Sequence, residues 1–217
     1  MIHSSTMEVH SHGFIWEKEL LRIYGATPEE IDHIPYTSKM DLPAELNRMD
    51  HCGVSIKTTC NKNMVCMADC LRIFDSSQQT THMTVVLYQQ RDSIKHLISI
   101  TEVDLSQSRD ILFGSLTREA LYELDQLVKS IPQKRRPTVE ERQRMYTLRD
   151  LLQAQSGALH LDIKCNSQQS RLQCSFNHFQ TFLEKYPMRI VAQSNTSEFR
   201  GGIISTHLVS ARRVFKR

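Results

Sequence analysis

The segment Gly53-Val54-Ser55-Ile56-Lys57-Thr58-Thr59 indicates a β-strand about which the rest of the chain can be arranged. Alternation with a period of two places Ser55 and Lys57 on one face and the apolar side chains on the other. A lysine is almost never fully buried without a partner. Lys57 therefore either lies on an exposed sheet face, which is the simpler interpretation, or points into a pocket that supplies a counter-charge or an anionic ligand.

An acid, Asp41 in Met40-Asp41-Leu42-Pro43, precedes this lysine by sixteen positions. The pattern Asp41…Ser55-Ile56-Lys57 resembles the PD-(D/E)xK nuclease superfamily, which includes most type II restriction endonucleases. In that family, an acid on one strand and an acid-x-lysine on the next hold Mg²⁺ beside the scissile phosphate, while the lysine activates or orients the attacking water. The resemblance implies an α/β or α+β fold with a mixed central β-sheet flanked by helices, with Asp41 as a metal ligand and Lys57 as the lysine.

The sequence departs from the family pattern at two positions. Ser55 stands where the family usually has Asp or Glu, and Met40 stands where it has Pro. A hydroxyl is a poor Mg²⁺ ligand because hard cations prefer anionic oxygens. Another acid must then contribute, and the candidates are Glu17, Glu19 and Asp69. Glu17 and Glu19 lie about 200° apart around a helix, so at most one of them reaches a common site. The resulting set is Asp41, Ser55, Lys57 and Glu19, with Asp41 and Asp69 as metal ligands.

A second strand pattern, Leu159 to Cys165, competes for the catalytic role because Asp162-Ile163-Lys164 is a literal acid-x-lysine. Glu102 or Asp104 would then be the distant acid. We favour Lys57 because Asp41 precedes it at the spacing that the family shows. Asp150, at a comparable distance before Lys164, lies in a helical pattern. Asp162 and Lys164 remain the alternative catalytic pair.

Charge is distributed unevenly along the chain, although the net charge is only +3. Residues 1–128 carry 11 Lys and Arg against 18 Asp and Glu, whereas residues 129–217 carry 16 against 6. We predict that the acidic half, 1–128, carries the nuclease core and that the basic half, 129–217, completes the sheet and contacts double-stranded DNA within one compact domain. The alternative is a basic surface that is solvated or folds back onto the acidic half.

Two polar stretches of the basic half are candidates for DNA contacts. The loop Gln133-Lys134-Arg135-Arg136 is flanked by prolines, and its three cations suit phosphate. The expected hairpin tip after residue 165 is rich in side chains that make bidentate base contacts. The residues of this tip that could contact base edges are Asn166, Gln168, Gln169 and Arg171. Exposed turns are commonly polar without any such role.

Composition excludes several other classes of protein. The chain has 217 residues, of which 40% are hydrophobic and 24% charged, which is typical of a globular domain with its own core. It has no apolar run of about 18 residues and no signal-peptide pattern at its start, so we expect no membrane association and an intracellular, reducing setting. The six cysteines fit a structural zinc site poorly, because only Cys66-x₃-Cys70 has a typical ligand spacing.

Periodicity and end signals predict the remaining elements. Helices are expected over 15–24, from Thr27-Pro28, over 117–131, from Pro137-Thr138 and over 177–186, with hairpin strands at 83–88 and 96–104. The function that these patterns favour is a Mg²⁺-dependent, sequence-specific endonuclease. A homodimer is expected by analogy, since palindromic sites suit two-fold symmetry. The alternatives are a non-catalytic DNA- or RNA-binding protein and a structural protein with buried cysteines.

Overall fold

The computed structural model describes residues 11–35, 38–132, 135–166 and 169–209, and the chain divides into two compact units. Unit 1 comprises Met1–Lys62, Thr80–Leu105 and Tyr186–Arg217, and unit 2 comprises Asn63–Gln79 and Ser106–Lys185. Both units therefore combine segments from before and after residue 128. Across the described residues the fold is mixed α/β, with seven α-helices and a mixed central sheet.

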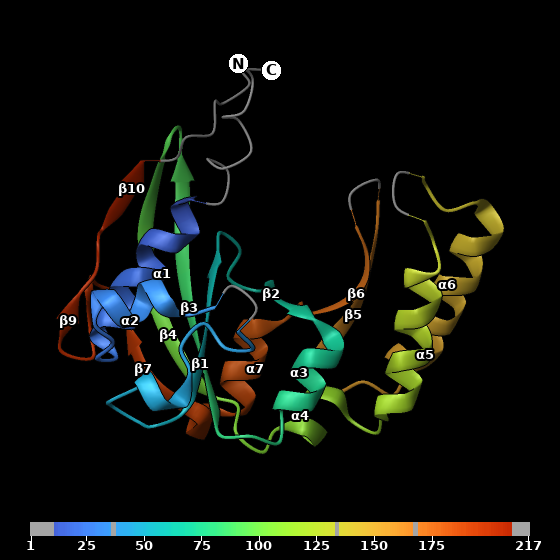
Figure 1. Ribbon diagram of the computed structural model, residues 1–217, viewed down its shortest axis with the longest axis horizontal. Helices are drawn as coiled ribbons and strands as arrows, with labels where there is room; N and C mark the ends of the chain where they lie inside the picture. The colour runs from blue at the N-terminus through green and yellow to red at the C-terminus, as the bar shows by residue number, and fades with distance from the viewer. Residues whose placement is uncertain (1–10, 36–37, 133–134, 167–168, 210–217) are drawn as a thin grey trace. The chain divides into compact units, whose positions relative to one another are not determined.

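Unit 1 is built on a mixed five-stranded sheet (Figure 1). Its strands are β1 (Gly53–Thr59), β3 (Thr81–Arg91), β4 (Ile94–Asp104), β7 (Ile190–Ser194) and β10 (His207–Val209). β1 pairs in parallel with β3, β3 is antiparallel to β4, and β4 is antiparallel to both β7 and β10. An isolated bridge joins Leu42 to Val54 in β1. The predicted mixed sheet is confirmed, and the predicted hairpin is β3 and β4, which turn at residues 92–93.

Helix α1 (Ser11–Ile23) packs its apolar stripe on this sheet, and α2 (Pro28–His33) follows it along the same face (Figure 1). Trp16, Leu20 and Tyr24 are fully buried in one core with residues of β1, β3 and β4. Burying a large apolar side chain contributes about 1.5–3 kcal/mol each, so this stripe fixes the helix on the sheet. Thr27 and Glu30 form a capping box at the start of α2, as the sequence predicts.

The remaining short elements of unit 1 shape its loops. They are the 3₁₀ helices η1 (Ala44–Leu46) and η2 (Pro187–Arg189) and the two-stranded ladder of β8 (Glu198–Phe199) and β9 (Gly202–Ile203). The β8–β9 turn holds Arg200 and Gly201 at positive φ, 49° and 81°. Two consecutive residues of this conformation suit the tight turn of a hairpin. The turn thereby fixes the position from which the Arg200 side chain extends.

Unit 2 contains an antiparallel three-stranded sheet in the order β2 (Val65–Asp69), β6 (Ser170–Phe176) and β5 (Leu159–Cys165). Its helices are α3 (Cys70–Ser76), α4 (Arg109–Phe113), α5 (Arg118–Lys129), α6 (Val139–Gln153) and α7 (Phe179–Lys185). The threonines predicted to begin α5 and α6, Thr117 and Thr138, both accept hydrogen bonds as N-caps. The predicted helices and the β5–β6 hairpin are therefore confirmed.

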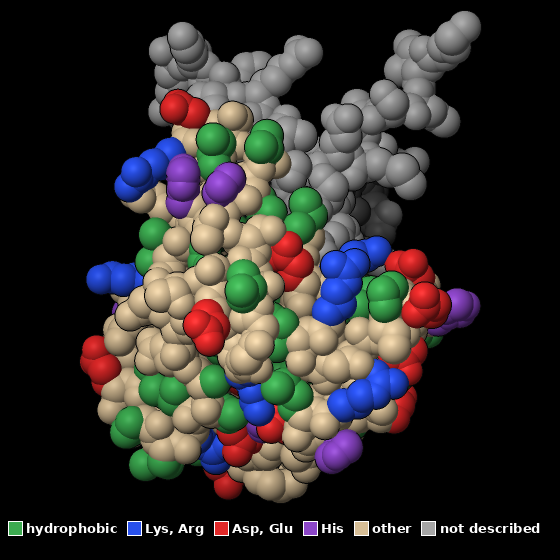
Figure 2. Space-filling view, turned by 90° about the vertical axis from the view of Figure 1, so that its left-hand side faces the viewer, with side chains coloured by type: hydrophobic (Ala, Val, Ile, Leu, Met, Phe, Trp, Pro, Cys, Tyr) green, Lys and Arg blue, Asp and Glu red, His purple; other side chains and the backbone are tan. Residues whose placement is uncertain are grey.

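Charged side chains of both signs are interspersed on the face of the molecule drawn in Figure 2. Side chains of Lys and Arg and of Asp and Glu are scattered there among hydrophobic and other side chains. This face therefore presents a mixed surface of the kind common on globular proteins. None of the helices in the described residues has the length and apolar character needed to cross a bilayer.

Candidate functional site

The carboxylate of Asp41 is held against β1 by three donors. Its Oδ2 accepts from the backbone N–H of Ile56 at 2.6 Å, from Ser55 Oγ at 3.2 Å and from Lys57 Nζ at 3.2 Å. Leu42, the next residue, pairs with Val54, which brings Asp41 alongside the strand. All three donors reach the same oxygen, and Oδ1 receives none of them. One oxygen thus fixes the orientation of the carboxylate while the other remains available to a ligand.

Lys57 points toward a counter-charge rather than into solvent. Its side chain retains 17% exposure and that of Asp41 retains 32%. Besides Asp41, Nζ donates to the carbonyl oxygen of Ile56 at 3.2 Å. Two acceptors hold the ammonium group near the sheet while water can still reach it. Of the two environments that the sequence allowed for Lys57, the structure shows the one with a counter-charge, which Asp41 supplies.

Glu17, on α1, belongs to the same electrostatic cluster. Burial and the negative charge of Asp41 raise the pKa of Glu17 from 4.5 to about 7, while Lys57 and Lys18 pull it in the opposite direction. A carboxyl group with this pKa is close to half ionised at neutral pH. Two carboxylates that oppose each other's ionisation are a common arrangement at cation sites, because a bound divalent cation removes the repulsion.

A pocket of about 320 Å³ opens between α1, α2 and the segment that carries Asp41. Its lining includes both acids of the cluster, and the remaining side chains are largely apolar. They are Lys18, Leu21, Ile31, Asp32, Ile34, Pro35, Ser38 and Met40. The cluster is therefore reached by solvent and by a small ligand from one side.

Glu19 and Asp69, both expected at the metal site, have other partners. Glu19 accepts from the backbone N–H of Ser205 at 2.9 Å and from its hydroxyl at 2.5 Å. Asp69 lies in unit 2 and caps α3 by accepting from Arg72 N at 2.9 Å. Glu17, rather than Glu19, is thus the acid of α1 that lies near Asp41. Both acids flank the apolar stripe of α1 in the sequence, so no local signal separates them.

The alternative pair, Asp162 and Lys164, lies on β5 in unit 2. Asp162 accepts from Ser175 Oγ at 2.5 Å and lies 3.1 Å from His160 Nδ1. Glu102, one distant acid considered for this pair, is fully buried in unit 1. The three groups around Asp41 converge on one carboxylate, whereas Asp162 is paired with a histidine and a serine of its own sheet.

Several candidate DNA contacts already have partners within the protein. Arg135 forms a bidentate ion pair with Glu141, at 2.7 and 2.6 Å. Glu141 also completes the N-terminal capping box of α6. Asn166 Oδ1 accepts from Gln169 N at 3.0 Å, which closes the β5–β6 turn. Arg136 is exposed, and Arg171 lies opposite Lys164 in the ladder. Lys134 and Gln168 lie outside the described residues.

Comparison of the chain with family models, with curated proteins and with solved structures finds no match. The chemistry of the Asp41 cluster must therefore carry the functional argument.

Proposed function

We propose that this protein is a Mg²⁺-dependent endonuclease that hydrolyses DNA phosphodiester bonds, with a core like that of the type II restriction enzymes. One observation carries the proposal: Asp41 is anchored by Lys57 and Ser55 on β1, and a second carboxylate, Glu17, lines the same pocket, where burial and the charge of Asp41 raise its pKa to about 7. Two acids and a lysine beside an accessible pocket make up the donor set that metal-assisted hydrolysis of a phosphodiester needs.

The residues divide into three roles. Asp41, through the oxygen that the strand leaves free, and Glu17 would hold Mg²⁺, since both supply the anionic oxygens that this ion prefers. When bound, Mg²⁺ neutralises charge on the phosphate and lowers the pKa of a bound water. Lys57 Nζ orients that water or stabilises charge on the phosphate. The Ser55 hydroxyl donates a hydrogen bond to Asp41 and so positions the carboxylate that would bind the metal.

A non-catalytic DNA- or RNA-binding protein is the second candidate function. Exposed cations such as Arg136 and the polar β5–β6 turn support binding without requiring any chemistry. Such a protein retards DNA in a gel and leaves it uncut, with or without Mg²⁺. Sequence-specific cleavage by a homodimer stays a prediction by analogy with restriction enzymes that act on palindromic sites.

The test is plasmid nicking by the wild-type protein and by Lys57→Ala, with Mg²⁺ and with EDTA. We expect Mg²⁺-dependent cutting by the wild type, and a loss of at least about 100-fold in Lys57→Ala with DNA affinity nearly unchanged, because the lysine contributes one charge among many. Lys62→Ala, an exposed lysine of the same unit, is the matched control and should cut like the wild type.

If Lys57→Ala still cuts the plasmid, Lys57 does not take part in the reaction. Lys164→Ala would then test the alternative lysine on β5. DNA binding by the wild type without cutting under any metal condition would favour the non-catalytic binder instead.

A further inference from the structure

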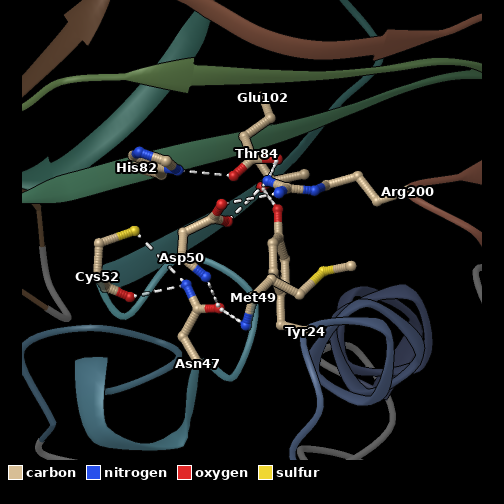
Figure 3. A network of polar contacts seen from close by, with 9 residues as sticks. All are labelled: Tyr24, Asn47, Met49, Asp50, Cys52, His82, Thr84, Glu102 and Arg200. Atoms are coloured by element: carbon tan, nitrogen blue, oxygen red, sulfur yellow. Dashed lines mark hydrogen bonds and ion pairs between the residues drawn. The ribbon is translucent and has the colours of Figure 1, made fainter.

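A network of polar side chains lies at the start of β1 and β3, all of it within unit 1 (Figure 3). It joins the loop before β1 to Glu102 on β4 and to Arg200 in the β8–β9 turn. Three of its members, Asp50, Cys52 and His82, each offer one ligand atom, and these atoms lie within 4.8 Å of one another. The proposed nuclease reaction uses none of the three.

The loop that carries Asp50 and Cys52 is held in shape by the fully buried Asn47. Asn47 Nδ2 donates to the carbonyl oxygen of Cys52 at 3.0 Å, and its Oδ1 accepts from the backbone N–H groups of Met49 and Asp50 at 3.1 and 3.2 Å. Figure 3 shows these contacts below the carboxylate and the sulfur. The two ligand-bearing residues are thus positioned by the fold itself.

The His82 ring is oriented by a buried carboxylate. Its Nδ1 lies 2.8 Å from Glu102 Oε1, and the side chains are 12% and 0% exposed. A histidine held in this way by a carboxylate is the usual arrangement at metal sites, where the acid fixes the ring and increases its basicity. Since His82 pairs with Val54 in the β1–β3 register, the ring also lies directly beside the end of the loop.

Charged side chains of both signs surround His82. Arg200 is the cation of this network, and it already pairs with Glu102 at 2.7 Å and with Asp50 at 2.8 Å. Both carboxylate oxygens of Asp50 face Arg200, with Oδ1 at 2.8 Å from Nη2 and Oδ2 at 2.8 Å from Nη1. A cation bound by Asp50, Cys52 and His82 would share the Asp50 carboxylate with Arg200.

We propose that Asp50, Cys52 and His82 bind one Zn²⁺ ion. A thiolate, an imidazole and a carboxylate form a ligand set typical of zinc, and a sulfur ligand disfavours the Mg²⁺ assigned to Asp41. Atoms that share a tetrahedral zinc lie about 3.3–3.8 Å apart, so the three side chains close by about 1 Å. The ion ties the 47–52 loop to the first residues of both parallel strands, and it leaves a fourth coordination position.

Metal-free wild-type protein titrated with Zn²⁺ provides the first test. We expect one tightly bound zinc per chain after gel filtration and a midpoint of thermal unfolding that rises with zinc concentration. X-ray absorption at the zinc edge should find one sulfur at about 2.3 Å, with the remaining ligands nitrogen or oxygen at about 2.0 Å. This measurement needs no variant, so a folding defect cannot obscure it. Two or more sulfur ligands, oxygen ligands alone, or binding below one ion per chain would overturn the proposal.

Variants identify the ligands. Cobalt(II) in place of zinc gives a sulfur-to-metal charge-transfer band, which should be lost in Cys52→Ser and retained in Cys60→Ser, an exposed cysteine of the same unit. His82→Asn and Asp50→Asn should each weaken zinc binding by more than the roughly 10–100-fold that loss of an outer-shell partner causes. A band that survives in Cys52→Ser would assign the metal to other cysteines and refute the site. Plasmid nicking tests the Asp41 cluster separately, so either proposal can fail alone.

Discussion

Replacing Glu17 by Gln should stabilise the metal-free protein at neutral and higher pH. The pKa of Glu17 is raised from 4.5 to about 7 in the folded state by burial and by Asp41. Between these two pH values the folded state binds the proton that the unfolded state releases, so the free energy of unfolding falls as pH rises. The stabilising contribution is complete below about pH 4.5 and is lost above about pH 7. Gln has nearly the same shape and does not ionise, so the variant lacks this dependence.

The magnitude follows from the size of the pKa change. A rise from 4.5 to about 7 is equivalent to at most about 3.4 kcal/mol. Glu17 lines an open pocket and faces Lys57 and Lys18, so water and these cations screen its charge. We therefore expect Glu17→Gln to exceed the wild type by about 1–2 kcal/mol at about pH 8, and to match it near pH 4.

Urea denaturation in EDTA at several pH values measures this difference. Glu45→Gln, an exposed acid of the same unit, is the control and should follow the wild type at every pH. Adding Mg²⁺ should make the wild type more stable than Glu17→Gln. An ion at about 100 times its dissociation constant stabilises the wild type by about 2.7 kcal/mol, and it stabilises the variant by less. A Glu17→Gln variant that is no more stable than the wild type at about pH 8, or equal stabilisation of both proteins by Mg²⁺, would contradict this prediction.

Three further predictions concern other contacts. Ser55→Ala should lower the rate of plasmid cutting by no more than about tenfold, because the Ile56 N–H and Lys57 still hold the Asp41 carboxylate after the hydroxyl is removed. A loss as large as that in Lys57→Ala would give the hydroxyl a direct role. Arg136→Gln should reduce the slope of the logarithm of the DNA-binding constant against the logarithm of salt concentration by about 0.9 if Arg136 contacts phosphate. Arg135→Gln should change this slope less, because Glu141 already pairs with Arg135. Equal changes of slope in filter binding would contradict this distinction. Asn47→Ala should lower the free energy of unfolding in urea by about 2–3 kcal/mol, because two backbone N–H groups and a carbonyl oxygen lose their buried partner. The exposed Asn195→Ala should stay within about 0.5 kcal/mol of the wild type, and similar losses in both variants would contradict the role of Asn47.

Local signals in the sequence predict most of the elements. Thr27 and Thr138 begin helices because the hydroxyl and the acid three residues later satisfy the first N–H groups, a contact that needs no other part of the chain. Alternation likewise predicts β1, with Val54 and Ile56 buried and Lys57 on the other face. The strand ends are less certain from sequence, and β3 and β4 extend to the turn at 92–93 because their ladder continues that far.

Charge along the sequence does not translate into charge on the folded units. Residues 1–128 and 129–217 differ strongly in composition, but the segments of unit 1 carry 14 Lys and Arg against 13 Asp and Glu, and those of unit 2 carry 13 against 11. Each unit is nearly neutral because it takes chain from both halves. A prediction that depends on long-range charge therefore needs the path of the chain as well as its composition.

The sequence by itself determines which residues can supply chemistry here, and the tertiary structure alone decides which of them meet. Asp41 and Lys57 can be named from their spacing, but only the bridge from Leu42 to Val54 brings the carboxylate to the lysine. Glu17 and Glu19 both flank the apolar stripe of α1, and only the folded chain places Glu17 near Asp41 and Glu19 against Ser205. His82 lies beside Asp50 and Cys52 because β1 pairs with β3, although residues 63–79, which belong to unit 2, separate the two strands in the sequence. Caps and periodicity are short-range interactions that a sequence records directly, whereas these contacts depend on strand pairing between residues far apart in the chain.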